Sequence, residues 1–63
     1  MPHISVEGPI LKDVEKKRKL VADMTAAATQ AYGVPKEAIV VVITENSPEN
    51  VGVAGVLIAD RGK

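Results

Sequence analysis

The amino-terminal stretch MPHISVEG places a proline directly after the initiator methionine. While Met1 is attached, the nitrogen of Pro2 belongs to an amide and has no useful basicity. Removal of Met1 turns this nitrogen into a free secondary amine, which can act as a base or as a nucleophile. An α-amino group ordinarily titrates at ~7.7–8.0, so an amine of this kind exchanges protons close to neutral pH. Pro2 is therefore the first candidate catalytic residue.

The composition leaves few other chemistries open. The chain has no cysteine, which excludes disulfides and thiolate metal sites. Its single histidine, His3, cannot build a zinc site with its neighbours, and strand alternation points its side chain away from that of Pro2. Glu7 and Glu45 lie near predicted strand ends, where solvent exposure or an ion pair is favoured over a carboxylate pair. We expect no metal site.

Length and charge bound the class of protein. The 63 residues form one domain, 1–63, and eight basic residues balance eight acidic ones, so nothing predicts general binding to nucleic acid or to an anionic membrane. No apolar stretch reaches the ~18 residues of a membrane span and no signal pattern opens the chain, which predicts a cytoplasmic location. Domains below ~70–80 residues usually need disulfides, metals or oligomerisation for stability. Oligomerisation is the remaining route here.

The chemistry needs a scaffold, and the chain reads as strand, helix, strand and hairpin. Residues 3–7 alternate and contain β-branched side chains, and the following Gly-Pro pair is expected to break this strand. The helical pattern runs over 14–32, with Asp13 as N-cap and Gly33 suited to the left-handed position that ends the helix. A second strand is predicted at 38–45.

Two features of the second half complete the fold prediction. The segment 51–60 is apolar and punctuated by glycine, which favours a short hairpin with a final edge strand. The five residues 39–43 are all β-branched and apolar, as in a parallel strand buried on both faces. We therefore predict an α/β (α+β) fold, a right-handed βαβ unit with parallel strands plus a C-terminal hairpin. One helix covers one sheet face, so another chain must bury the other.

Taken together, the proline after the initiator, the βαβ pattern, VVITE closing the second strand and the glycine-rich GVAG resemble the 4-oxalocrotonate tautomerase family. The resemblance covers essentially the whole chain. It implies a homohexamer built as a trimer of dimers, without a cofactor. It also implies an isomerase that interconverts enol and keto forms of small 2-oxo acids, with the amino-terminal proline as general base.

Carried over residue by residue, the resemblance gives a mixed site. The catalytic proline falls at Pro2, and an arginine that binds the substrate carboxylate falls at Lys12, which keeps the charge but loses the two-pronged hydrogen-bonding fork. A second arginine falls at Val40, so that cation is missing, and a phenylalanine lining the pocket falls at Val51. Arg18 is the spare cation for a second oxyanion contact, across a subunit boundary.

Two other functions stay open beside the tautomerase. A hydratase or dehalogenase of haloacrylates would use the same scaffold but needs a carboxylate to activate water, and no residue clearly fills that role. A non-catalytic oligomeric binding or scaffold protein would keep the fold without a competent pocket, and the missing arginine at Val40 favours it. A catalyst should be sensitive to retention of Met1, whereas a scaffold should not.

Overall fold

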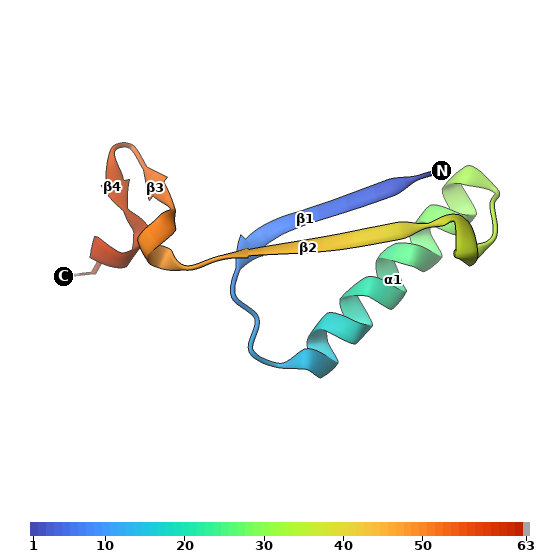
Figure 1. Ribbon diagram of the computed structural model, residues 1–63, viewed down its shortest axis with the longest axis horizontal. Helices are drawn as coiled ribbons and strands as arrows, with labels where there is room; N and C mark the ends of the chain where they lie inside the picture. The colour runs from blue at the N-terminus through green and yellow to red at the C-terminus, as the bar shows by residue number, and fades with distance from the viewer. Residues whose placement is uncertain (63) are drawn as a thin grey trace.

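The computed structural model describes residues 1–62. Strand β1 and helix α1 lead into strand β2, and a small hairpin of strands β3 and β4 follows (Figure 1). Short 3-10 helices occupy two of the connections in the second half, and a third follows the last strand. The elements are β1 His3–Pro9, α1 Val14–Tyr32, β2 Val40–Asn46, β3 Gly52–Val53 and β4 Val56–Leu57, with 3-10 helices at Lys36–Ala38, Pro48–Asn50 and Ile58–Asp60.

Local signals set both ends of α1, as the sequence predicts. Asp13 precedes the helix in extended conformation, and its side-chain Oδ1 accepts a hydrogen bond from the backbone N–H of Glu15 at 2.9 Å. This bond satisfies one of the free N–H groups of the first turn. Gly33 ends the helix at φ 65°, and its N–H donates to the carbonyl of Thr29 at 2.9 Å. The predicted span 14–32 is confirmed.

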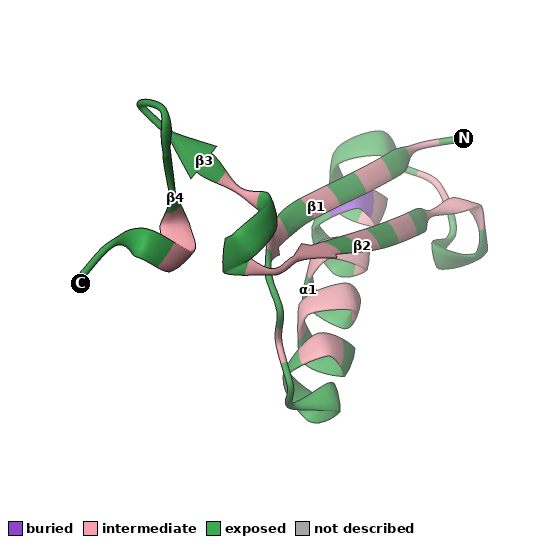
Figure 2. Ribbon diagram, turned by 60° about the vertical axis from the view of Figure 1, so that its left-hand side comes forward, coloured by how far each residue is buried: buried purple, intermediate pink, exposed green. Residues whose placement is uncertain are grey.

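Strands β1 and β2 lie side by side and parallel, joined by α1, so the βαβ prediction is also confirmed. Their register pairs His3 with Val40 and Pro9 with Asn46. Exposure alternates along both strands, and Figure 2 shows this as bands of exposed and half-buried residues. Helix α1 packs on one face of the sheet, where the half-buried side chains gather. That face carries Ile4, Val6, Val41 and Ile43.

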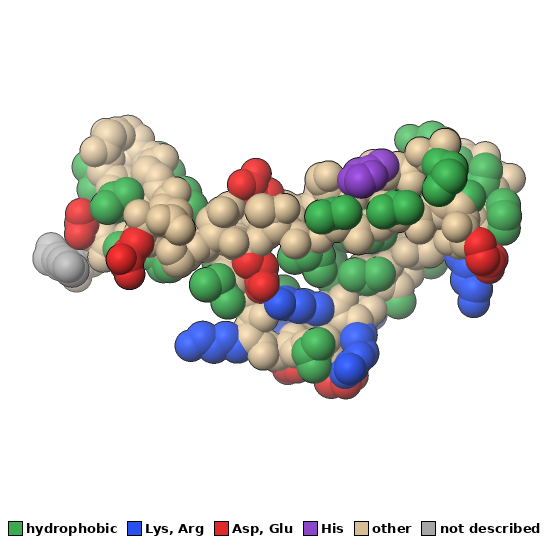
Figure 3. Space-filling model, in the orientation of Figure 1, with side chains coloured by type: hydrophobic (Ala, Val, Ile, Leu, Met, Phe, Trp, Pro, Cys, Tyr) green, Lys and Arg blue, Asp and Glu red, His purple; other side chains and the backbone are tan. Residues whose placement is uncertain are grey.

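The opposite face of the sheet is uncovered in the single chain. Val40 and Val42 are 39% and 42% exposed there, next to His3, Ser5 and Glu7 of β1. Among residues 1–62 only Ala28 is buried, at 7% exposure. Hydrophobic side chains reach the surface along the strands and over the hairpin (Figure 3). One chain alone therefore forms no closed core.

Three boundaries differ from the sequence prediction. β1 continues through Gly8 to Pro9, because a proline is tolerated at the end of a strand with no neighbour on its other side. β2 begins at Val40 and not at residue 38, because Lys36–Ala38 form a 3-10 turn in which the amide of Ala38 donates to Pro35 at 3.0 Å. The predicted final edge strand is short, since a 3-10 turn follows Leu57.

The C-terminal hairpin is a separate two-stranded sheet that does not join β1 and β2. Val53 pairs with Val56 across a two-residue turn of Ala54 and Gly55, both with positive φ (55° and 81°). This is the pattern of a type I′ turn. Figure 1 shows the hairpin standing away from the βαβ unit, so its apolar side chains have little of this chain to pack on.

Candidate active site

Pro2 lies at the amino-terminal end of the sheet, just before β1. Its carbonyl oxygen accepts a hydrogen bond from the amide of Val40 at 3.2 Å, which fixes it beside the first residue of β2. Pro2 itself is half-buried, whereas Met1 is 89% exposed. The backbone thus holds the candidate base firmly at one sheet end, with Met1 pointing into solvent.

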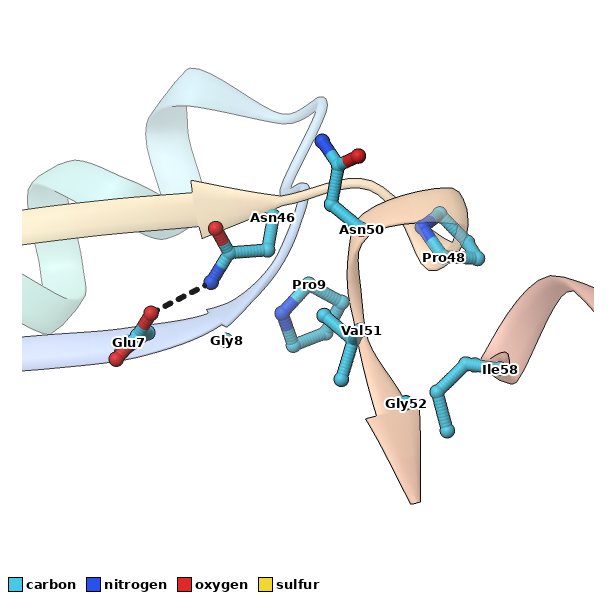
Figure 4. Close-up of a pocket in the computed structure, with 9 residues that line it drawn as sticks. All are labelled: Glu7, Gly8, Pro9, Asn46, Pro48, Asn50, Val51, Gly52 and Ile58. Atoms are coloured by element: carbon cyan, nitrogen blue, oxygen red, sulfur yellow. Dashed lines mark hydrogen bonds between the residues drawn. The ribbon is translucent and has the colours of Figure 1, made fainter. Parts of the chain in front are cut away.

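A pocket of about 660 Å³ lies at the other end of the two strands (Figure 4). The carboxyl ends of β1 and β2 form one side of it, and the segment between β2 and the hairpin forms the other. Ligand sites commonly lie outside the carboxyl ends of parallel strands. The lining residues are Glu7, Gly8, Pro9, Asn46, Pro48, Asn50, Val51, Gly52 and Ile58.

The pocket combines an apolar wall with one ordered polar pair. Pro9, Val51 and Ile58 provide the apolar surface. The side-chain amide of Asn46 donates to Oε2 of Glu7 at 2.8 Å, and Figure 4 shows this bond at the strand ends. A few polar groups on an apolar wall are typical of small-molecule sites. Val51, a candidate from the sequence, therefore does line a pocket.

Lys12 lies in the connection between β1 and α1. Its side chain is exposed, and it makes no hydrogen bond or ion pair with the rest of the described chain. The preceding residue is anchored, because the amide of Leu11 donates to Oε2 of Glu45 at 2.5 Å. Oε1 of Glu45 accepts from Nζ of Lys17 at 2.7 Å. The backbone just before Lys12 is thus anchored, and the ammonium group of Lys12 has no hydrogen-bond or ion-pair partner among the described residues.

The environment of Glu45 changes the ionisation of its carboxyl group. The hydrogen bond from Lys17, followed by that from the Leu11 amide, lowers the pKa of Glu45 below its ordinary value, against the opposing effect of partial burial. The carboxylate form is therefore favoured. Glu7 and Glu45 belong to separate contacts, so no carboxylate pair forms between them.

Arg18 lies on the exposed surface of α1, where it forms an ion pair with Glu15 one turn earlier. Its side chain is 64% exposed. Lys19 is paired in the same way with Asp23, at 2.6 Å. Lys17, the residue before Arg18, instead turns towards β2, where it forms an ion pair with Glu45. A substrate contact by Arg18 remains a prediction.

The single chain does not bring the predicted site residues together. Pro2 precedes the seven-residue β1, and Lys12 follows it. A strand rises ~3.3 Å per residue, so the two lie about 20 Å apart. Val51 lines the far pocket, so within one chain it does not lie beside Pro2. Pro2 instead lies beside Val40, whose amide donates to its carbonyl oxygen.

Several residues of this region were not singled out as site residues from the sequence. Asn46 and Pro9 come to the pocket because β1 and β2 end in register. Glu45 meets Leu11 across 34 positions of sequence and Lys17 across 28. Their position at the ends of predicted parallel strands could have indicated a site, because ligands bind in the crevice outside the carboxyl ends of such strands.

Residues 1–62 contain neither a cluster of metal-ligating side chains nor a membrane-spanning helix. No three side chains of His, Cys, Asp or Glu gather in a way that could hold a metal ion. None of the helices in this part of the chain is long and apolar enough to cross a membrane.

Comparison with known proteins agrees with this fold and places the chain in a family. Residues 2–61 match the family model described as tautomerase enzyme. A curated relative from Bacillus cereus, called "Probable tautomerase", is 34% identical over 61 residues, which cover 97% of this chain and 100% of the relative.

Solved structures show the same arrangement. DmpI from Archaeoglobus fulgidus is 49% identical with a TM-score of 0.84, covering 94% of this chain and 100% of that one. A heterohexamer 4-oxalocrotonate tautomerase from Chloroflexus aurantiacus is 26% identical with a TM-score of 0.86, covering 97% and 98%. The βαβ unit and hairpin are thus a tautomerase fold. The chain belongs to the 4-oxalocrotonate tautomerase family.

Proposed function

We propose that this protein is a cofactor-independent tautomerase of small carboxylate-bearing enols, with Pro2 as general base once Met1 is removed. The observation that carries the proposal is the placement of Pro2 in a family fold. Its carbonyl is fixed by the amide of Val40, so the adjoining nitrogen has a defined position at the sheet end. A base acts well only when it is held within reach of the proton that it takes.

We further propose that each site is shared between copies of the chain in a homohexamer, a trimer of dimers. Two observations support sharing. Pro2 and Lys12 lie about 20 Å apart along β1, too far to contact one small substrate. The sheet face with Val40 and Val42 is uncovered, and a second copy would bury it. Pro2 of one copy would then face the Lys12 and Val51 end of another.

The reaction needs few parts. The nitrogen of Pro2 takes a proton from the enol hydroxyl of a 2-hydroxydienoate, or from the carbon next to the carbonyl of a β,γ-unsaturated 2-oxo acid. Lys12 binds the carboxylate and stabilises the negative charge that develops on the dienolate. The protonated Pro2 then returns the proton to another carbon of the substrate. A cation and an apolar wall beside the amine favour its neutral form, which is the form that accepts protons.

The remaining candidates shape the pocket. Val51 replaces a phenylalanine of the family pattern and would leave more room at the apolar wall. Arg18 is our candidate for the second oxyanion contact in place of the cation missing at Val40, once its ion pair with Glu15 opens. These differences favour a substrate other than the best-known one of the family.

One observation favours a second function. Glu7 lines the pocket with its carboxylate held by Asn46, and a carboxylate is what a hydratase or dehalogenase on this scaffold needs to activate water.

Processed protein assayed on a panel of 2-hydroxydienoates, phenylenolpyruvate and haloacrylates separates the functions. Ketonisation supports the tautomerase, and halide release that is lost in Glu7→Gln supports the second function. Inactivity on the whole panel, from a folded oligomer, supports the scaffold.

A further inference from the structure

We propose that Glu45 is a positioning residue that fixes Lys12 in the connection between β1 and α1, an inference that rests on the proposed function. Glu45 is the next-to-last residue of β2, and its neighbour Asn46 lines the pocket. Both of its carboxylate oxygens are occupied. Oε2 accepts from the amide of Leu11 at 2.5 Å, and Oε1 accepts from Nζ of Lys17 at 2.7 Å.

The first of these bonds acts on the segment that carries the substrate-binding cation. Ile10 to Lys12 lie between β1 and α1 without secondary structure of their own. The bond to Leu11 reaches across 34 positions and ties this segment to the end of β2. Lys12 is the next residue along the chain. The point from which its long side chain extends is thus set by Glu45.

The second bond engages the neighbouring lysine, Lys17, and does not act on the segment that carries Lys12. Lys17 is engaged by Glu45, and its side chain is 29% exposed. Lys12 is exposed and has no partner among the described residues. A charge-assisted bond holds its cation more firmly than a neutral hydrogen bond does. Glu45 thus keeps Lys17 on the helix side of the sheet and leaves Lys12 as the cation for a carboxylate.

The inference predicts a specific kinetic pattern. Glu45 does not touch substrate, so its loss should weaken carboxylate binding and leave the base in place. A shift of ~1 Å in the position of a binding group can lower the reaction rate about 100-fold. For Glu45→Ala we expect KM to rise about tenfold or more, with a fall in kcat no larger than that of Lys12→Ala. A general loss of folded protein would instead lower kcat and leave KM unchanged.

Two matched variants separate the two bonds. Glu45→Gln keeps an oxygen that can accept from the amide of Leu11 but loses the charge that holds Lys17. Lys17→Met removes the ion pair and leaves the carboxylate for Leu11. Both variants should keep KM near that of the wild type if the Leu11 bond positions Lys12. KM values as high as that of Glu45→Ala in both would show that the ion pair matters and would overturn the inference.

A double-mutant cycle tests whether Glu45 acts through Lys12. In a Lys12→Ala background, adding Glu45→Ala should not raise KM further, because the group being positioned is gone. Independent, multiplying effects on KM would contradict the inference. All variants are compared as processed oligomers of confirmed mass and size.

A second readout needs no activity and so separates this inference from the proposed function. We expect the Leu11 amide to exchange slowly with solvent in wild type and in Lys17→Met, and quickly in Glu45→Ala. Titration with 2-oxoglutarate followed by NMR should show equal weakening in Lys12→Ala and Glu45→Ala. Wild-type protein that is inactive but follows this pattern contradicts only the proposed function. An active enzyme with unchanged KM and binding in Glu45→Ala contradicts the role of Glu45.

Discussion

Pro2 and Lys12 lie at opposite ends of β1, with all seven residues His3–Pro9 between them. At ~3.3 Å per residue the strand keeps them about 20 Å apart. A substrate small enough to be an enolised 2-oxo acid cannot contact both within one chain. Pro2 and Lys12 can therefore act on one substrate only if they come from different chains, and one experiment tests both roles together.

Mixed oligomers test the sharing of sites between chains. Pro2→Ala and Lys12→Ala should each be weakly active alone, because every site lacks one of the two groups. Unfolding and refolding them together should restore activity well above the sum of the separate variants, because some shared sites then have both residues intact. The measurement is initial rate after co-refolding at equal protomer concentration.

The control for this experiment is wild type refolded with the double variant Pro2→Ala/Lys12→Ala. There, mixing separates intact groups and should lower activity below that of the wild-type fraction alone. No gain of activity in the first mixture and no loss in the second, from proteins shown to exchange subunits, would mean that each chain forms its own site.

Substitution of Lys12 tests its role as the carboxylate-binding group. Lys12→Ala should raise KM and lower kcat, because it removes both an anchor and a stabiliser of developing charge. The acidic limb of the pH–rate profile should move to higher pH, since a cation that favours the neutral amine is lost. Lys12→Arg should retain activity and bind carboxylates through its planar fork. Lys19→Ala, which removes a neighbouring surface cation, is the matched control, and equal kinetics in the two alanine variants would place Lys12 outside the site.

The ion pair of Glu45 makes stability depend on pH. Its pKa is lowered in the folded chain, so the unfolded chain binds the proton more readily, and the stabilisation is present above the ordinary value of about 4.5. It is lost as the pH falls through the lowered folded value. We expect wild type to exceed Glu45→Gln in urea midpoint at pH 7 and the gap to shrink below pH ~4.5. A gap that stays constant with pH would show that the charge of Glu45 contributes nothing to stability.

The local features of this fold could be predicted from sequence and the long-range contacts could not. Asp13 and Gly33 mark the helix ends because a cap and a left-handed turn depend on adjacent residues. The Glu45–Leu11 bond depends on register across 34 positions, which no local pattern encodes. The separation of Pro2 from Val51 has the same cause, because only the parallel pairing of β1 and β2 places them at opposite sheet ends.

The hairpin turn offers a test of backbone strain. Ala54 has φ 55°, a left-handed conformation that costs a residue with a Cβ ~1–2 kcal/mol. Asparagine is preferred at this position of a type I′ turn. We expect Ala54→Asn to stabilise the protein by about 0.5–1 kcal/mol in chemical unfolding at fixed protomer concentration.

Gly55→Ala is the matched control for this turn. Nothing lies within 4 Å of a Cβ added at Gly55, so its cost would come from φ 81° alone. This variant should be destabilised by ~1 kcal/mol. A neutral Gly55→Ala together with a destabilised Ala54→Asn would contradict the assignment of the turn.

The most direct test of the central claim compares protein beginning at Pro2 with protein that retains Met1. Intact mass confirms each amino terminus, and ketonisation of a 2-hydroxydienoate gives the rates. We expect processed protein to be active. The Met1-retaining form should react ~10²–10⁴-fold or more slowly, because its Pro2 nitrogen is an amide and Met1 obstructs the substrate. Processed Pro2→Ala should keep weak activity through its primary amine. Equal rates with and without Met1 would contradict Pro2 as the base.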